Sequence, residues 1–266
     1  MPTLADVVDL LHEWYPPGTA MDGDAVGLVA GDPSAPVDKV MFAVDATIEV
    51  AQESVECGAD LLVVHHPLYL TPVSSVAATT PKGRTLHALT SGGCALLTAH
   101  TNADQASSGV SESMAYALGL RDLAPIRPTA PGSATGVGRV GAIDETTLGA
   151  FAARVAEALP TTAHGVRVAG ESDRVVRRVA VCGGAGDFLL DELVDADVDV
   201  FVTSDLRHHR AGEFLEHRGA ALVDVAHWAA EWTWLPVVEA RLRETLGARV
   251  ETRVSTQCTD PWTFRH

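Results

Sequence analysis

The sequence is poor in aromatic and basic residues, and each shortage excludes a class of protein. Aromatic residues make up only 5% of the 266 residues, so the hydrophobic 47% must build a core from Ala, Val and Leu. Lys and Arg number 19 against 35 Asp and Glu, which gives a net charge of −16. A chain this acidic repels phosphate backbones and anionic lipids, so we expect no nucleic acid and no membrane surface as a partner. No run approaches the roughly 20 apolar residues that span a bilayer.

Cysteine is also scarce and never occurs in a CxxC motif. The four cysteines stand far apart at positions 57, 94, 182 and 258, which predicts reduced and mostly buried thiols. The N-terminal segment carries acidic residues where a signal peptide needs a basic flank. These features lead us to expect a cytoplasmic protein.

Short apolar runs alternate with helical patterns along the chain, the rhythm of an α/β protein. We predict strands over 39–44, 59–64, 94–99, 138–143, 175–182, 198–203 and 221–225. We predict helices near the N-terminus and over 48–57, 82–91, 111–118, 145–159, 188–194, 211–218 and 231–246. This alternation favours two α/β domains with mainly parallel sheets flanked by helices. A Pro- and Gly-rich passage over 125–138 suggests domains 1–126 and 127–234, and leaves open whether 235–266 return to the first domain.

Histidine and carboxylate side chains follow three of the predicted strands. His65 and His66 come after the second strand, Asp104 after the third, and His227 and Glu231 after the last. Ligands bind outside the carboxyl ends of strands in open α/β sheets. His227 and Glu231 are four residues apart, so a helix beginning there would place both on one face. The pattern predicts a metal site at the C-terminal ends of the strands, between the domains.

The types of ligand narrow the choice of metal. Imidazole with carboxylate suits Zn, Mn, Fe, Co or Ni, and the absence of a nearby thiolate disfavours a closed structural zinc site. Three histidines and two carboxylates exceed what one catalytic zinc commonly takes. A pair of ions about 3.5–4 Å apart would use them all, and such a pair activates water.

Three segments resemble the signatures of one family. They are Val63-Val64-His65-His66-Pro67-Leu68, Ala99-His100-Thr101-Asn102-Ala103-Asp104 and Asp224-Val225-Ala226-His227-Trp228-Ala229-Ala230-Glu231. In this combination and order the chain looks like a member of the Nif-three-like family, whose members are also described as GTP cyclohydrolase I type 2 homologues or dinuclear-metal-centre hexameric proteins. The stretches 22–31 and 203–209 add weaker matches, with Ser204 where the family usually has Gly.

The resemblance implies a dinuclear site for two divalent metal ions, built from His65, His66, Asp104, His227 and Glu231. It implies that His66 and Asp104 hold one ion and His65 and His227 the other, with Glu231 bridging them. It also implies a homohexamer, a trimer of dimers.

Other polar residues have two interpretations each. His100 either supports a metal ligand and relays protons or only packs in a turn, and His209 is either an acid/base group or a solvated loop residue. Asp205 and Arg207 are candidates for binding a small anionic substrate. Asp45 either supports a ligand or, as we favour, caps the following helix.

Two classes of function remain open. The first is a metal-dependent hydrolase that acts on a nucleotide or phosphate ester through a metal-activated water, for which the family description suggests a GTP cyclohydrolase-like activity. The second is a non-catalytic protein for metal storage, metal delivery or scaffolding that acts through protein partners.

Overall fold

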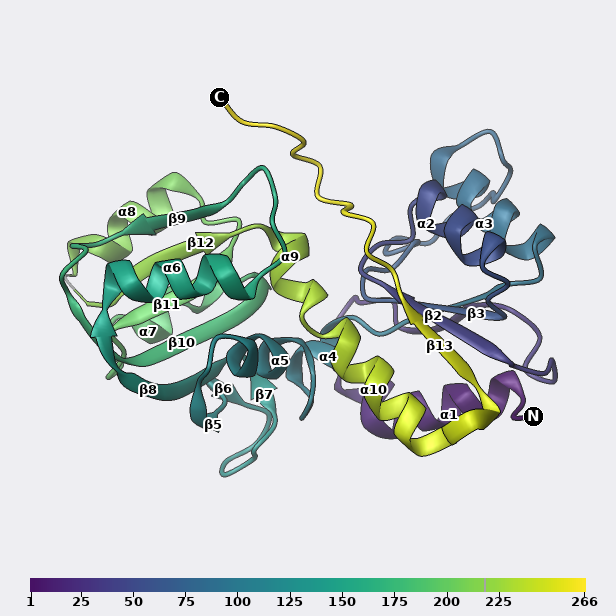
Figure 1. Ribbon diagram of the computed structural model, residues 1–266, viewed down its shortest axis with the longest axis horizontal. Helices are drawn as coiled ribbons and strands as arrows, with labels where there is room; N and C mark the ends of the chain where they lie inside the picture. Colours follow the sequence, from purple (N-terminus) through teal and green to yellow (C-terminus); the bar gives the residue numbers. More distant parts are fainter. Residues whose placement is uncertain (218) are drawn as a thin grey trace. The chain divides into compact units, whose positions relative to one another are not determined.

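The computed structural model describes residues 1–217 and 219–266. The chain divides into two compact units, each formed from two stretches of sequence (Figure 1). The first unit comprises Met1–Ala103 and Leu235–Thr259, and the second comprises Asp104–Trp234 and Asp260–His266.

The first unit contains a five-stranded sheet in the order β1-β4-β3-β2-β13. Its elements are α1 (Leu4–Trp14), η1 (Pro17–Thr19), β1 (Gly27–Ala30), β2 (Lys39–Ala43), α2 (Ile48–Glu56), β3 (Leu61–Val64), α3 (Pro81–Ser91), β4 (Ala95–Thr98), α10 (Leu235–Leu246), η3 (Gly247–Arg249) and β13 (Glu251–Val254), while α4 (Thr101–Gln105) crosses into the second unit. Every pairing is parallel except that of β1 with β4. Parallel β2, β3 and β4 therefore end side by side at one edge of the sheet.

Helices cover both faces of this sheet, which explains its continuous apolar strands. All four residues of β3 and of β4 are buried. One set, which includes Met41, Leu62 and Leu96, packs against α2 and α3. Helices α1 and α10 lie on the other side of the strands (Figure 1). A strand buried on both faces has no polar face, as expected in a parallel sheet.

The second unit contains a six-stranded sheet in the order β5-β8-β10-β11-β12-β9. Its elements are α5 (Val110–Ala117), β5 (Arg121–Ala124), β6 (Arg127–Pro128), β7 (Gly136–Val137), β8 (Arg139–Thr147), α6 (Leu148–Ala158), β9 (Val166–Ala169), β10 (Val175–Ala185), η2 (Asp187–Leu189), α7 (Leu190–Leu193), β11 (Val200–Ser204), α8 (His208–Glu216), β12 (Ala221–Val225) and α9 (His227–Trp232). Only β10, β11 and β12 pair in parallel, and the other pairings are antiparallel. The α/β class is confirmed, but this sheet is mixed because the antiparallel strands β5 and β8 border its parallel centre on one side and β9 borders it on the other.

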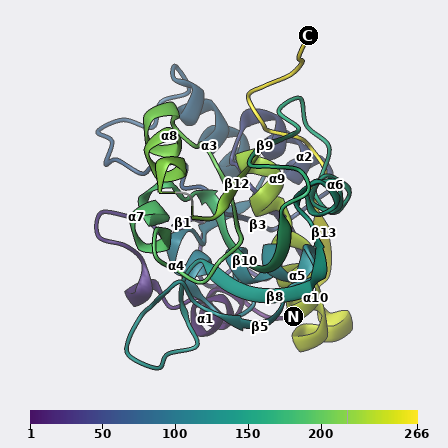
Figure 2. The same ribbon diagram turned by 90° about the vertical axis from the view of Figure 1, so that its left-hand side faces the viewer.

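Alternate side chains of the central strands face different helices. Ala180, Cys182 and Phe201 belong to the cluster that packs with η2, α7 and α8. Figure 2 shows the sheet between these helices and a second layer of α5, α6 and α9. Helix α9 follows β12 directly, so its first turn lies at the carboxyl end of the parallel strands.

The division between the units falls earlier than the Pro- and Gly-rich passage suggested. Helix α5 contacts β8 and β10, and β5 pairs with β8, so residues from 104 onward already belong to the second unit. The passage itself forms the small β6-β7 hairpin. Of the C-terminal segment, residues 235–259 return to the first unit and 260–266 stay with the second.

Two predicted helix boundaries are wrong for local reasons. The helix expected from residue 145 begins at Leu148, because Thr147 is its N-cap and accepts a hydrogen bond from the amide of Ala150. The helix expected over 231–246 is two helices. Pro236 occupies the second position of α10, where its missing N–H costs no helical hydrogen bond, and α9 ends before it at Trp232.

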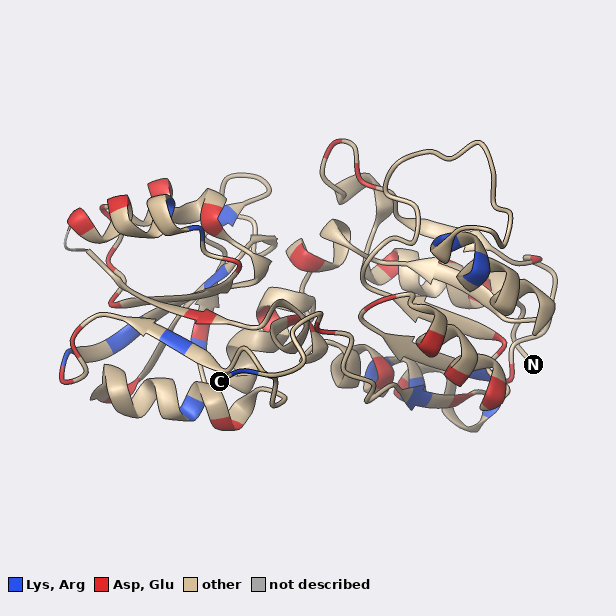
Figure 3. Cartoon of the chain, turned by 90° about the horizontal axis from the view of Figure 1, so that it is seen from above, with Lys and Arg blue, Asp and Glu red and all other residues tan. Residues whose placement is uncertain are grey.

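Acidic side chains are spread over the helices and loops of both units (Figure 3). In the part of the chain described, no helix combines the length and apolar character that crossing a membrane requires.

Candidate metal centre

Three histidines of the first unit lie together where β3 and β4 end. His65 and His66 directly follow β3, and His100 follows β4. One ring nitrogen of each lies within 4.8 Å of those of the other two. The ring centroids of His65 and His66 are 5.0 Å apart, and that of His100 lies 5.1 Å from His65. Parallel pairing of β3 with β4 produces this cluster, because it brings the two strand ends to one edge.

Each of these rings is held through its Nδ1 atom by an oxygen. His65 Nδ1 lies 2.9 Å from the carbonyl oxygen of Ala99, and His66 Nδ1 lies 2.7 Å from Asp45 Oδ1. A carbonyl or carboxylate oxygen only accepts, so each Nδ1 carries the proton and donates it. The neutral ring then presents the lone pair of Nε2. Metal-ligating histidines are commonly held in this way.

The third ring is held by a network that begins before β1. His100 Nδ1 donates to Asp24 Oδ1 at 2.8 Å, and the amide of Thr101 donates to Asp24 Oδ2 at 3.1 Å. Burial opposes ionisation of Asp24, but the hydrogen bonds from His100 and Thr101 outweigh it and hold the pKa of this carboxyl below its ordinary value. Burial lowers the pKa of His100, and the neighbouring His65 contributes to this shift. A buried, neutral imidazole is the form that binds a metal.

Asp45 does not cap helix α2. The N-cap is Thr47, whose side chain accepts from the amide of Val50. The two oxygens of Asp45 instead accept from His66 and from the hydroxyl of Thr259. Asp45 therefore supports His66, the alternative that we did not favour from the sequence.

The second unit presents a matching pair at the start of α9. His227 Nε2 lies 2.8 Å from Glu231 Oε1, one helical turn away. His227 Nδ1 donates to Asp205 Oδ2 at 2.6 Å. Glu231 is almost fully buried, at 2% exposure. An imidazole nitrogen and a buried carboxylate that face each other are groups that could serve as metal ligands.

The loop that carries Asp205 is held in an unusual conformation. Asp205 has φ +57°, in the left-handed region that few non-glycine residues adopt. The next amide, that of Leu206, donates to Asp224 Oδ1 at 3.2 Å. Asp224 is buried on β12 and also contacts His164 and Arg167. These contacts fix the loop so that Asp205 reaches His227, which is how a strained position persists at a functional site.

A glycine of β10 packs directly against this pair. A Cβ added to Gly184 would lie 2.6 Å from Glu231 Oε1 and 3.2 Å from His227 Nε2, and Gly184 has φ +68°. Strand β10 runs on to Ala185, and the glycine leaves the space that the side chains of His227 and Glu231 occupy.

The remaining predicted ligand, Asp104, is half-buried on α4. Within the second unit, burial is the main reason that the pKa of the Cys182 thiol is raised far above its ordinary value, and the carboxylates of Asp104 and Glu231 raise it further. Both carboxylates therefore lie near the end of β10. Cys182 stays protonated at neutral pH and is no thiolate ligand.

The other predicted site residues are less closely associated with these ligands. Arg207 donates from Nε to Asp187 Oδ2 at 2.6 Å, and its side chain is 73% exposed. His209 is exposed on the first turn of α8, with its ring 5.3 Å from that of His208. Their proposed roles in catalysis and substrate binding stay predictions, as does that of Asp205 in substrate binding.

Sequence reasoning missed that Asp24 holds His100, and it interpreted Asp45 as the cap of helix α2. Both are carboxylates that precede the histidines they hold by 76 and 21 residues, respectively. Asp45 follows β2 as His66 follows β3, so its position at a strand end was the available signal. Asp24 lies in a loop with no such signal.

Two α/β units that present imidazole and carboxylate groups at the ends of parallel strands place the chain in a class of α/β proteins with groups that could hold a metal ion. The sequence pattern of the Duf34/NIF3 (NGG1p interacting factor 3) family matches residues 2–261, and the chain belongs to this family.

Individual relatives are similar to this chain in sequence and in structure. A Streptomyces coelicolor protein named GTP cyclohydrolase 1 type 2 homolog is 47% identical over 269 residues, covering 99% of this chain and 94% of the relative. The crystal structure of a Bacillus cereus protein related to NIF3 matches with a TM-score of 0.91 at 25% identity and covers 99% of both chains. A Staphylococcus aureus hypothetical protein matches with a TM-score of 0.90 at 28% identity over the full length of both chains.

Proposed function

We propose that this protein binds two divalent metal ions and uses them to hydrolyse a nucleotide or another phosphate ester. The ligands in this proposal are His65, His66, Asp104, His227 and Glu231. The assignment of each ligand to one ion follows the resemblance to the family, with Glu231 as the bridge.

One observation carries the proposal of metal binding. Every histidine in the proposed ligand set donates its Nδ1 proton to an oxygen, from Ala99, Asp45 or Asp205. Packing alone does not require three rings to share one tautomer, whereas this tautomer leaves the lone pair of every Nε2 available to a metal. The donor set contains nitrogen and oxygen without thiolate, which fits Zn, Mn, Fe, Co or Ni.

When bound, two such ions supply a water of lowered pKa and a clamp for phosphoryl or carbonyl oxygens. The chain contributes the orientation of the ligands. Asp45 and Asp205 hold the rings of His66 and His227 and would offset the positive charge of a cation bound to these rings. In this proposal His100, which Asp24 holds, accepts a proton; its ring lies beside those of His65 and His66. The names of the relatives support a nucleotide as the first substrate class to examine.

The metal content of the purified protein tests the metal centre. We expect about two ions per chain by mass spectrometry of gently purified protein, because the donor set exceeds that of one ion. Glu231→Gln keeps the shape of the side chain but removes its charge, and it should lower the content sharply. Glu216→Gln, on the exposed end of α8, is the matched control and should leave it unchanged. Fewer than half an ion in the wild type, even after metal addition, would refute the proposal.

Turnover tests the hydrolase. Nucleotides, GTP among them, and simple phosphate esters are assayed with Mn, Zn, Fe or Co added to metal-stripped protein. We expect turnover that needs metal and is lost in Glu231→Gln. Full metal content without turnover on any substrate, together with rapid release under mild chelation, would instead favour metal storage or delivery.

We also propose that the chain forms a homohexamer, a trimer of dimers, as its resemblance to the family implies. Mass photometry at nanomolar concentration should find a single species of six chains. A monomer or dimer would refute this part of the proposal while leaving the metal centre intact.

A further inference from the structure

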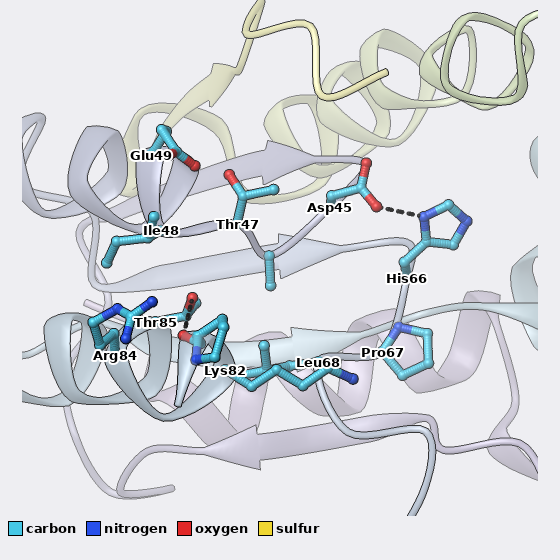
Figure 4. A pocket seen from close by; sticks show the side chains of 12 residues that line it. Asp45, Thr47, Ile48, Glu49, His66, Pro67, Leu68, Lys82, Arg84 and Thr85 are labelled. Carbon is cyan, nitrogen blue, oxygen red and sulfur yellow. Dashed lines mark hydrogen bonds and ion pairs between the residues drawn. The ribbon is translucent and has the colours of Figure 1, made fainter. Parts of the chain in front are cut away.

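A cavity of about 390 Å³ lies in the first unit beside the Asp45–His66 pair (Figure 4). It is open to solvent and is lined by the start of α2, the Pro67-Leu68 turn and the first turns of α3. This volume lies within the range of about 300–1,000 Å³ that small-molecule sites occupy. The cavity therefore has room for a small organic ligand.

Two basic side chains of α3, Lys82 and Arg84, line this cavity. Neither forms an ion pair or side-chain hydrogen bond within residues 1–217 and 219–266. Lys39, which is the other lysine of the chain, contacts Glu251 and the carbonyl oxygen of Cys57. In a chain of net charge −16, two basic groups left without carboxylate partners at one cavity form a local site for an anion.

The carboxylates of the cavity do not neutralise these cations. Asp45 uses one oxygen to accept from His66 and the other to accept from Thr259. Glu49 is exposed, and Figure 4 shows it on the opposite side of the cavity from Lys82 and Arg84. The titratable and charged groups of the lining are thus these two acids, the two cations and His66.

The backbone around the cavity adds to this preference for an anion. Helices α2 and α3 both begin at the lining, with Thr47 and Thr80 as N-caps. Each cap satisfies one amide, and the other first-turn amides have no partner within the helix. Helix N-termini also carry partial positive charge, which reinforces the effect of the side chains.

Apolar groups form the rest of the wall. Leu68, Ile48 and Pro81 line the cavity, and Lys82 extends along Leu68 in Figure 4. An inorganic anion would leave these groups in contact with water. An organic anion would cover them with its apolar portion while its charge meets Lys82 and Arg84.

We propose that this cavity binds a phosphate monoester, with the phosphoryl oxygens on Lys82 and Arg84 and the ester group on Leu68 and Ile48. The site borders the proposed metal centre, because His66 lines the cavity, but its phosphoryl contacts are Lys82 and Arg84. His66 donates from Nδ1 toward Asp45, and its other ring nitrogen points away from that residue (Figure 4). Binding therefore needs no metal.

Calorimetric titration of the metal-stripped, full-length protein with phenyl phosphate and with inorganic phosphate tests this site. We expect phenyl phosphate to bind more tightly, because only its ring covers the apolar wall. Lys82→Ala and Arg84→Ala should each weaken its binding by about tenfold or more, the effect of one lost charge-assisted hydrogen bond. Arg84→Lys should recover part of the loss.

Arg243→Ala is the matched control, since it removes one exposed positive charge of the same unit on α10. It should change the affinity by less than about twofold. The proposal is overturned if neither probe binds, if the α3 variants bind as the wild type does, or if Arg243→Ala weakens binding equally. Binding that appears only after metal is restored would also overturn it, because the phosphate would then be a metal ligand. Metal content, measured on the same samples, reports separately on the proposed metal centre.

Discussion

Substitution of Gly184 by alanine should lower both the folding stability and the metal content of the protein, whereas a control substitution should lower the stability alone. The left-handed φ of +68° alone costs about 1–2 kcal/mol once a Cβ is present. The Cβ would also lie 2.6 Å from Glu231 Oε1, closer than atoms of real side chains approach. Glu231 is 2% exposed and has little room to move, and overpacking of this kind costs about 1–3 kcal/mol. We therefore expect Gly184→Ala to destabilise the metal-free protein by about 2–5 kcal/mol.

Gly132→Ala provides the matched control within the second unit. Gly132 has φ +78°, and nothing lies within 4 Å of its added Cβ, so this variant carries the backbone cost without the collision. Thermal unfolding of metal-stripped protein should show the smaller loss for Gly132→Ala, at about 2–4 °C per kcal/mol. Metal content should fall in Gly184→Ala alone, because the added Cβ displaces Glu231 and His227 from their present positions. Equal metal content and equal unfolding temperatures in the two variants would refute the reasoning.

Three further predictions follow from individual contacts. Asp205→Gly should weaken metal binding about 10–100-fold in a chelator competition, because His227 loses its acceptor. The stability of its metal-free form should change by less than about 1 kcal/mol, since relief of the positive φ offsets the lost hydrogen bond, and a large fall in stability would contradict this. Arg139→Met should cost about 3–5 kcal/mol in urea unfolding, because it breaks a buried ion pair, whereas Arg121→Met, at an exposed pair, should cost no more than about 1 kcal/mol. The pKa of Asp24 is lowered in the folded state, so its stabilising contribution is fully present above the ordinary carboxyl pKa and is lost as pH falls through the lowered value. Unfolding of Asp24→Asn should accordingly be less sensitive to acid than that of the wild type.

The sequence predicted the central strands well because they are buried on both faces. Strand β3 is a continuous apolar run, and β12 is interrupted only by the buried Asp224; the structure has both strands within the predicted segments. The edge strands β1, β9 and β13 were missed, because each is short and at least partly exposed. Their positions depend on pairing with strands far along the chain, which local periodicity does not report.

The same distinction applies to the candidate site. The position of His65 and His66 after β3 was readable because a strand end is a local feature. Their cluster with His100 depends on the parallel pairing of β3 with β4. Asp24 and Asp205, which hold His100 and His227, lie in loops whose conformation is imposed by tertiary contacts. Asp205 adopts a positive φ there. Residue types therefore indicated metal chemistry, whereas the orientation of the ligands required the fold.

The order in which the chain leaves the ribosome gives the late pairing of β13 a further consequence. The first sheet needs residues 251–254 to complete its parallel edge beside β2, and α10 also belongs to this unit. Residues 104–234, which hold the whole six-stranded sheet, emerge before that segment exists. During synthesis residues 1–103 therefore cannot complete their sheet, because β2 still lacks its neighbour β13. Residues 104–234 are by then already able to fold. Nascent chains stalled between residues 234 and 251 should depend most on chaperones, because they expose this incomplete sheet.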